Sequence, residues 1–199
     1  QILNSDASCS DNKVSGKTPI GVVVHVSPEG CGWAITAMPA AEMKAWSMER
    51  VNTGVFRSDD RQQIVKDFDV KGNMDKIIQT ANDRHGDNAA KFYPAAYAAL
   101  NYMPSEVPTT KGKWMLPSAG ILNNVCENLD IVNKAISKLS GIQLRGDVEY
   151  IWSSSEYNTA AAWYFTASYY YNGECLNEKN KSATQGGITY YVVRPVIEF

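Results

Sequence analysis

The chain of 199 residues has little of what marks a protein for membranes or nucleic acids. No apolar run approaches the roughly 20 residues that a membrane-spanning helix needs. With 19 Lys and Arg against 21 Asp and Glu, the formal charge is -2, so no basic field attracts nucleic acid or anionic lipid. We therefore expect no nucleic-acid partner and no transmembrane segment in this chain.

Cysteines are few and widely spaced, and no CxxC pair occurs, which argues against a zinc ribbon or a thioredoxin-type site. An even number is compatible with two disulfides in an oxidising compartment. We interpret them as the pairs Cys9–Cys31 and Cys126–Cys175, each stabilising by roughly 3 to 4 kcal/mol. Four cysteines permit three connectivities, and buried free thiols remain the alternative.

The first residues, QILNSDASC, have neither a basic n-region nor an apolar h-region, so they indicate a mature or trimmed N-terminus. Residues 1–18 are rich in Ser, Asp, Asn and Lys and predict a polar leader with little intrinsic order. Residues 19–199 are then a single domain, large enough to bury a sizeable core without a metal cofactor.

The first half predicts a hairpin followed by helices. Residues 20–26 and 32–38 are apolar, β-rich runs on either side of a Pro-Glu-Gly turn, which is typical of two paired strands. Between residues 59 and 102 the apolar spacing becomes helical, with Asn73 as an expected cap of one helix and Pro94 at the start of another.

The second half predicts two more helices and then a return to strands. Ser118 and Asp130 each precede an amphipathic run and are expected near helix starts. Residues 150–154, 163–171 and 189–197 follow as strands. Strands at both ends around central helices predict an α+β domain whose mixed or antiparallel sheet is closed by the terminal strands. We expect residues 20–26 to pair directly with residues 191–197.

Several segments also carry a family resemblance: GKWMLPSAG at 112–120, WSSSEY at 152–157, AWYF at 162–165 and VRPV at 193–196. They resemble a family of bacterial surface domains with a C-type-lectin-like fold. Some members form the C-terminal adhesive domain of collagen-like adhesins, and others occur in fimbria-associated proteins of gut anaerobes. The resemblance implies an extracellular or cell-surface, outer-membrane-associated setting. It brings no catalytic residues with it.

Such a scaffold raises the question of calcium-dependent sugar binding. The Glu-Pro-Asn, Gln-Pro-Asp and Trp-Asn-Asp tripeptides by which C-type lectins hold calcium and sugar do not occur in this sequence. The segment from Asp67 to Asp75 only superficially follows a calcium-loop spacing, because Lys71 and Ile78 stand where ligands are required. We expect helix capping and turn formation there, with a looser cation site as the alternative. No cofactor is implied.

Enzymatic chemistry has weak support. The three serines of WSSSEY lack the glycine-flanked elbow of an α/β-hydrolase, and only His25 and His85 offer an imidazole base. The distantly similar sulfatase-modifying enzymes need a cysteine pair late in the chain, where only Cys175 is present. We expect the protein not to be an enzyme.

A recognition surface is the stronger functional interpretation. Alternation in residues 161–171 places one set of side chains in the core and the other at the surface, and a polar excursion follows the Asn-Gly turn. Tyr provides broad amphipathic contact, and Asn provides adaptable hydrogen bonds. The expected ligand-binding residues are Tyr157, Asn158, Tyr169, Tyr171, Asn172, Asn177, Glu178 and Lys179.

Two functions fit these observations. The main one is a secreted or surface-anchored, adhesin-like domain that binds a host protein, a glycan or a neighbouring subunit. The alternative is a structural subunit or module of a fimbrial or envelope assembly that binds only its assembly partners, which terminal strands available for edge pairing would favour. The sequence does not fix the oligomeric state.

Overall fold

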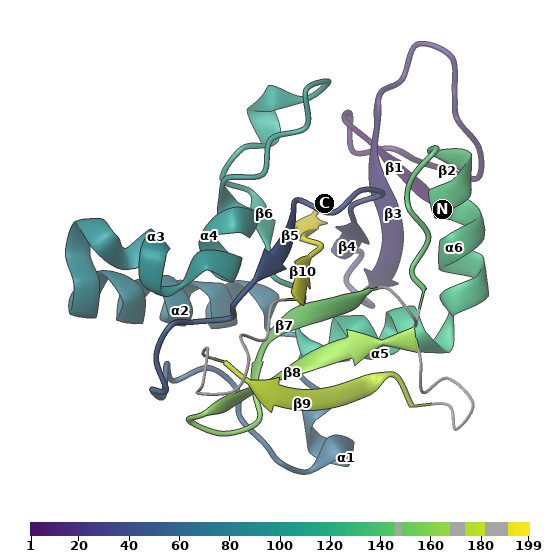
Figure 1. The fold of residues 1–199 in the computed structure, drawn as a ribbon. Coiled ribbons are helices and arrows are strands. Elements are labelled where there is room, and N and C mark those ends of the chain that lie inside the picture. The colour runs from purple at the N-terminus through teal and green to yellow at the C-terminus, as the bar shows by residue number, and fades with distance from the viewer. Residues whose placement is uncertain (146–148, 168–173, 182–190) are drawn as a thin grey trace.

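The computed structural model describes residues 1–145, 149–167, 174–181 and 191–199. In this part of the chain two β-sheets combine with helices, so the protein is α+β, as the sequence predicts (Figure 1). The finer assignment to a C-type-lectin-like fold stays a prediction.

The first sheet contains strands from the beginning, middle and end of the chain, in the order β2-β1-β3-β4-β11-β6, with every neighbouring pair antiparallel. Its strands are β1 (Ile2–Asn4), β2 (Cys9–Ser10), β3 (Pro19–Val26), β4 (Gly32–Ile35), β6 (Trp114–Met115) and β11 (Val196–Glu198). The predicted hairpin is confirmed as β3 and β4.

Direct pairing of residues 20–26 with the terminal strand is wrong, because β4 lies between them. Ile35 of β4 is paired with Val22 of β3 on one side and with Val196 of β11 on the other. The hairpin uses one edge of β4, so only its other edge is open to the returning chain. The two segments nevertheless share a sheet.

The expectation of little order in residues 1–18 also needs correction. Ile2 and Leu3 are fully buried in β1, which pairs with β3 along the edge that β4 leaves free. They are an apolar pair in an otherwise polar stretch, and burial against the sheet removes them from water.

The second sheet is mixed, in the order β5-β10-β7-β8-β9, with only β10 and β7 parallel. Its strands are β5 (Ala41–Lys44), β7 (Tyr150–Glu156), β8 (Ala161–Thr166), β9 (Leu176–Asn180) and β10 (Tyr191–Val193). The last predicted strand breaks at Pro195, which has no N–H to donate to a ladder. There the chain leaves the second sheet at β10 and enters the first at β11.

Six α-helices accompany the two sheets in the described part of the chain. They are α1 (Arg61–Ile64), α2 (Val70–His85), α3 (Ala89–Phe92), α4 (Pro94–Leu100), α5 (Ala119–Glu127) and α6 (Leu129–Lys138), with short 3-10 turns at Gly86–Asn88 and Pro108–Thr110. In Figure 1, α2, α3 and α4 gather on one side of the molecule, and α6 lies on the other side beside β3. None of the helices in the described part of the chain has the length and apolar character needed to cross a bilayer.

The helix starts differ from the predicted ones by a few residues. Asp69, not Asn73, caps α2, because its Oδ1 accepts a hydrogen bond from Gly72 N at 2.8 Å. Asn73 instead lies buried in the first turn. Ser118 does stand at the N-cap of α5, but its hydroxyl donates to Asp67 O at 2.7 Å. Asp130 falls in the first turn of α6, where the helix dipole stabilises a negatively charged carboxylate.

The three tryptophans of the motif segments lie in the core. Trp114, Trp152 and Trp163 are at most 4% exposed, and each indole N–H has a partner. Trp114 donates to Thr110 Oγ1, and the other two donate to the carbonyls of Lys44 and Ser58. These tryptophans therefore hold the scaffold together.

One of the two predicted disulfides is confirmed. Cys126 of α5 is bonded to Cys175 before β9, with a Cα–Cα distance of 5.7 Å. The Cys9–Cys31 pair is wrong, since both thiols are free and exposed. Cys9 is paired with Leu3 of β1, which is itself paired with Gly21 near the start of β3. Cys31 precedes Gly32, which is paired with Val26 at the other end of β3. At about 3.3 Å per residue that end is roughly 16 Å further along β3, beyond the about 6 Å that a disulfide spans between Cα atoms.

Candidate functional site

The predicted recognition residues that the structure describes lie in two places on the second sheet. Tyr157 and Asn158 form the turn between β7 and β8, and Asn177, Glu178 and Lys179 belong to β9. β8 separates the two groups, pairing with β7 on one side and with β9 on the other. Tyr169, Tyr171 and Asn172 lie outside the described residues, so they stay a prediction.

In the β7–β8 turn, both side chains have structural contacts. The Tyr157 ring is half-buried and packs edge-on against Trp163, with 5.4 Å between the ring centroids. Asn158 is exposed, but its Oδ1 accepts hydrogen bonds from the backbone N–H groups of Ala160 and Ala161 at 2.8 and 2.9 Å. Its carbonyl oxygen is therefore already used by the turn, and only its N–H₂ is left for a ligand.

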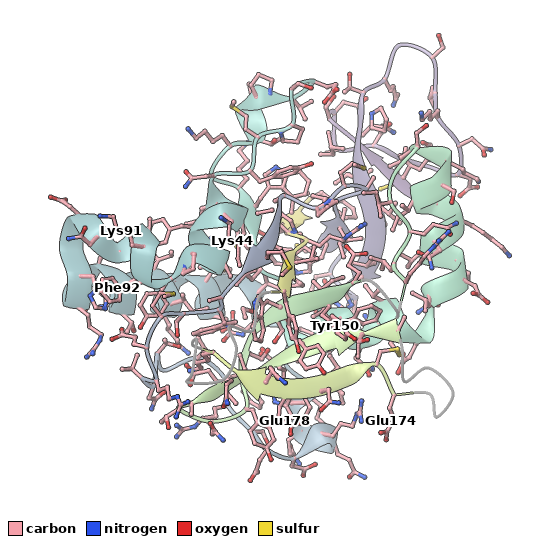
Figure 2. All side chains as sticks on the ribbon, in the orientation of Figure 1. Lys44, Lys91, Phe92, Tyr150, Glu174 and Glu178 are labelled. Atoms are coloured by element: carbon pink, nitrogen blue, oxygen red, sulfur yellow. A yellow bond between two sulfur atoms is a disulfide. The ribbon has the colours of Figure 1, made fainter. Side chains whose placement is uncertain are left out.

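β9 is the outermost described strand of its sheet and presents charged side chains. Glu178 and Lys179 are exposed, whereas Asn177 is half-buried and accepts a hydrogen bond from the Glu178 N–H at 2.9 Å. Figure 2 shows Glu178 at the margin of the molecule near α1, with Glu174 further along the same margin. Glu174 is paired with Arg61 of α1 at 2.5 Å. Charged residues on an outer strand oppose indiscriminate strand pairing.

An aromatic cluster on the same sheet was not among the predicted site residues. Tyr150 stacks on Tyr191 with 5.0 Å between centroids, and Tyr191 lies 4.6 Å from both Trp152 and Tyr164. Tyr150 and Tyr191 are half-buried, and the other two are buried (Figure 2 labels Tyr150). The parallel pairing of β10 with β7 brings them together, and no local sequence signal announces that pairing.

A groove of about 560 Å³ runs along α2 between that helix, α4 and β6. Its apolar lining comes from Met74 and Ile78 of α2 together with Leu100 and Met115. Exposed polar residues at a spacing of four along α2 form its rim. They are Lys71, Asp75, Gln79 and Asp83. The rim carries both signs of charge, so it favours no particular ionic ligand.

The serines of WSSSEY are buried and serve a hydrogen-bond network. The Ser155 hydroxyl donates to Asp67 Oδ2 at 2.5 Å, and the Asn73 amide donates to the same oxygen at 2.8 Å. Burial raises the pKa of the Asp67 carboxyl, while the hydrogen bond from Ser155 opposes that rise. At Gly120 a side chain would collide with Asp67 O, which lies 2.4 Å from an added Cβ. The network therefore joins α5 to the loop before α2.

The same network uses the carboxylates for which the sequence left a cation site as the alternative. Asp67 and Asp69 are engaged by backbone and side-chain donors within their own turn, so the capping interpretation holds. Among the described residues, no group of three or more His, Cys, Asp or Glu is placed to hold a metal ion. His25 stacks on Phe68 and hydrogen-bonds to Asn124, so it packs at the rim of the core.

A surface-near cluster around Glu49 joins the loop after β5 to the helices. Its carboxylate receives two hydrogen bonds from Arg84, one from Tyr93 at 2.7 Å and one from His85 at 2.9 Å. The Arg84 guanidinium, more than the other partners, lowers the pKa of Glu49 to about 2. The His85 ring stacks on Phe92, which Figure 2 labels on α3. These contacts tie the loop after β5 to α2 and to Tyr93 between α3 and α4.

Comparison of the sequence with protein-family models and with curated proteins returns no match. The fold is similar to the crystal structure of a fimbrial protein from Bacteroides ovatus, with a TM-score of 0.56 and 17% sequence identity. The likeness covers 100% of this chain and 49% of that protein, so the chain spans about half the length of the fimbrial protein. At this identity the likeness is one of fold.

Proposed function

We propose that this chain is a structural module of a cell-surface fimbrial assembly, with neighbouring subunits or domains as its binding partners. The observation that carries the proposal is the fold likeness to a fimbrial protein, which extends over the whole chain. In this function the chain acts through surface contacts and is not an enzyme. The internal bracing by a disulfide and by buried ion pairs fits a domain that works outside the cell.

The polar edge at β9 supports this proposal. Asn177 to Asn180 offer hydrogen-bonding and charged groups on an outer strand, where a neighbouring subunit can reach backbone and side chains together. A predominantly polar contact of this kind is typical of the contact between domains or of reversible association.

The test is to locate the domain on cells that produce the full-length protein. Antibodies against the isolated domain, used in immunogold electron microscopy, are expected to label filaments along their length, and filaments sheared from the cells are expected to contain the protein. A deletion strain is the control. Label on the cell body with no filament present would contradict the proposal.

The adhesin-like function remains the second candidate, supported by the resemblance of residues 112–120 and 152–157 to surface domains with a C-type-lectin-like fold and by exposed Glu178 and Lys179 on β9. It predicts label at filament tips and a hit when the isolated domain probes an array of glycans and host proteins. The matched control is the double variant Glu178→Ala/Lys179→Ala, which should lose the hit if this edge binds.

A further inference from the structure

Lys181 and Glu156 form an ion pair that is completely enclosed by protein. Both side chains are 0% exposed, and Lys181 Nζ lies 2.5 Å from Glu156 Oε1. The same Nζ donates to Val51 O at 2.9 Å and lies 4.5 Å from the centre of the Trp46 ring. An amine and a carboxyl group are thus held in contact where water does not compete.

The backbone fixes both residues in place. Glu156 closes β7 and exchanges hydrogen bonds with the neighbouring loop, donating to Phe56 O and accepting from Ser58 N. Lys181 directly follows β9, donates to Ala160 O at 2.9 Å and accepts from Ser47 N at 3.2 Å. Two reacting groups positioned by rigid neighbours gain much of the advantage of an intramolecular reaction.

The two oxygens of Glu156 differ sharply in their surroundings. Oε1 accepts hydrogen bonds from Thr53 N at 3.1 Å and Thr53 Oγ1 at 2.8 Å as well as from Lys181. Oε2 is buried and has no hydrogen-bond partner among the described residues. A buried carboxylate oxygen without a donor is rare in folded proteins and requires an explanation.

A second buried ion pair in the described part of the chain lacks this asymmetry. In the pair of Glu149 with Arg194, Oε1 accepts from Nε at 2.8 Å and Oε2 accepts from Nη2 at 3.3 Å. Simple charge neutralisation therefore does not require an orphaned oxygen in this protein. Guanidinium is also not nucleophilic, because it stays protonated, whereas a desolvated lysine can give up its proton.

We propose that Lys181 and Glu156 are a site of spontaneous cross-linking, at which an isopeptide bond joins Nζ to the side-chain carbonyl carbon. Nζ transfers a proton to the carboxylate and attacks Cδ as a neutral amine, forming the Nζ–Cδ bond. The Cδ–Oε2 bond breaks, and Oε2 leaves as water with two of the three ammonium protons. One ammonium and one carboxylate thus give one amide and one water, and no other reactant is needed.

The surroundings supply what this reaction needs. Burial lowers the pKa of Lys181, although the neighbouring Glu156 opposes that effect. The N–H and hydroxyl of Thr53 point at Oε1, where negative charge develops when Nζ attacks, and they act there as an oxyanion hole. Oε2, which has no donor in the described part of the chain, is the oxygen that leaves. Oε1, to which the Thr53 donors are bonded, remains as the carbonyl oxygen of the amide.

The decisive measurement is the intact mass of the full chain after folding and denaturation. The cross-link predicts a mass lower by one water molecule, in addition to the two hydrogens lost in the Cys126–Cys175 disulfide. Proteolysis and tandem mass spectrometry should then give a branched peptide that contains both Glu156 and Lys181. Cyclisation of Gln1 is distinguishable, because it releases ammonia instead of water.

Three variants make the result specific. Lys181→Met/Glu156→Leu replaces both partners by apolar groups of similar size, so it should fold without a buried charge and keep its full mass. Thr53→Val keeps the pair but removes one oxyanion donor, and it should slow the appearance of the cross-linked species at least tenfold. Glu149→Leu/Arg194→Met should leave the mass deficit of one water unchanged.

A wild-type chain that keeps its full mass after prolonged incubation in the folded state would overturn the proposal and leave an ordinary ion pair. The same holds if the water loss persists in Lys181→Met/Glu156→Leu. The branched peptide, absent from that variant, would establish the cross-link independently of any fimbrial role.

Discussion

Arg194 and Glu149 form a buried ion pair in which Nε donates to Oε1 at 2.8 Å. The two Nη atoms of the guanidinium also donate to the carbonyls of Thr36 and Ala37, in the loop after β4, and of Ile142, in the loop after α6, so this one side chain ties two loops to the start of β7. Arg194 follows β10 directly, where the chain crosses from the second sheet to the first. Arg194 therefore acts as an anchor between the two sheets through its bonds to loop carbonyls.

Breaking this pair should destabilise the fold strongly. Arg194→Met leaves the Glu149 carboxylate buried without its partner, and such losses typically cost about 3 to 5 kcal/mol in the free energy of unfolding. Urea denaturation followed by tryptophan fluorescence measures the effect. The control Glu149→Leu/Arg194→Met should recover much of the loss, and a single variant as stable as the wild type would contradict the anchoring role.

Acid should weaken the fold through Glu49. Its pKa is about 2 in the folded protein against an ordinary 4.5, so between these values the unfolded chain binds more protons. The stabilisation is complete above pH 4.5 and is lost as the pH falls toward 2. At about 1.4 kcal/mol per pKa unit the shift corresponds to at most about 3.5 kcal/mol, and solvent screening at this site near the surface reduces the stabilisation to roughly 2 to 3 kcal/mol.

Glu49→Gln should therefore lower the free energy of unfolding at pH 7 by roughly that amount and flatten its decline between pH 4.5 and 2. Urea titrations at a series of pH values test this directly. Glu178→Gln, at an exposed position on β9, is the matched control and should follow the wild-type curve. An unchanged pH profile in Glu49→Gln would show that its contacts contribute little.

The redox state should follow the observed pairing. Thiol titration of the unfolded, non-reduced protein is expected to find Cys9 and Cys31 reactive and the other two cysteines protected. Cys126→Ala/Cys175→Ala removes a bridge that spans 49 residues, which by loop entropy should cost about 4 kcal/mol. Cys9→Ser/Cys31→Ser should leave the melting temperature unchanged. Four reactive thiols would contradict the bridge.

Local patterns in the sequence predicted the elements well, and long-range pairing poorly. The apolar spacing from Met74 to Ala81 and the proline at residue 94 both fall inside observed helices, α2 and α4. The position of β4 between β3 and β11 depends on which sheet edges are open when the chain returns. The residue spacing within 191–197 does not show which strand these residues will pair with. Pro195 is the one local signal that the chain changes from one sheet to the other there.

The candidate site was predictable only in part for a related reason. Glu178 and Lys179 are exposed on β9, the outermost described strand of its sheet, as a polar excursion suggests. Lys181, only two residues further, is completely buried, because its partner Glu156 lies on another strand and the Trp46 ring comes from a third segment. A lysine is expected to be exposed unless a partner offsets the cost of burying its charge. The partners of Lys181 are distant in the sequence, so no local pattern predicts its burial.

Single substitutions can show which of the predicted recognition residues stabilise the fold and which are free to bind a partner. Tyr157→Ala removes a ring packed on Trp163 and should cost about 2 kcal/mol in stability, since it leaves a partial cavity. Asn158→Ala removes the acceptor of two turn hydrogen bonds and should cost about 1 kcal/mol. Both would reduce binding only as far as they unfold the domain.

Glu178→Ala and Lys179→Ala should change the melting temperature little, because neither side chain has a described partner. If β9 is a contact edge, these two variants should weaken association with filament fragments or with an array hit by about 1 to 2 kcal/mol each, as for residues at the core of an interface. Measuring melting temperature and affinity on the same preparations separates the two effects. Full affinity in both variants would remove β9 from the binding surface and direct the search to the groove along α2.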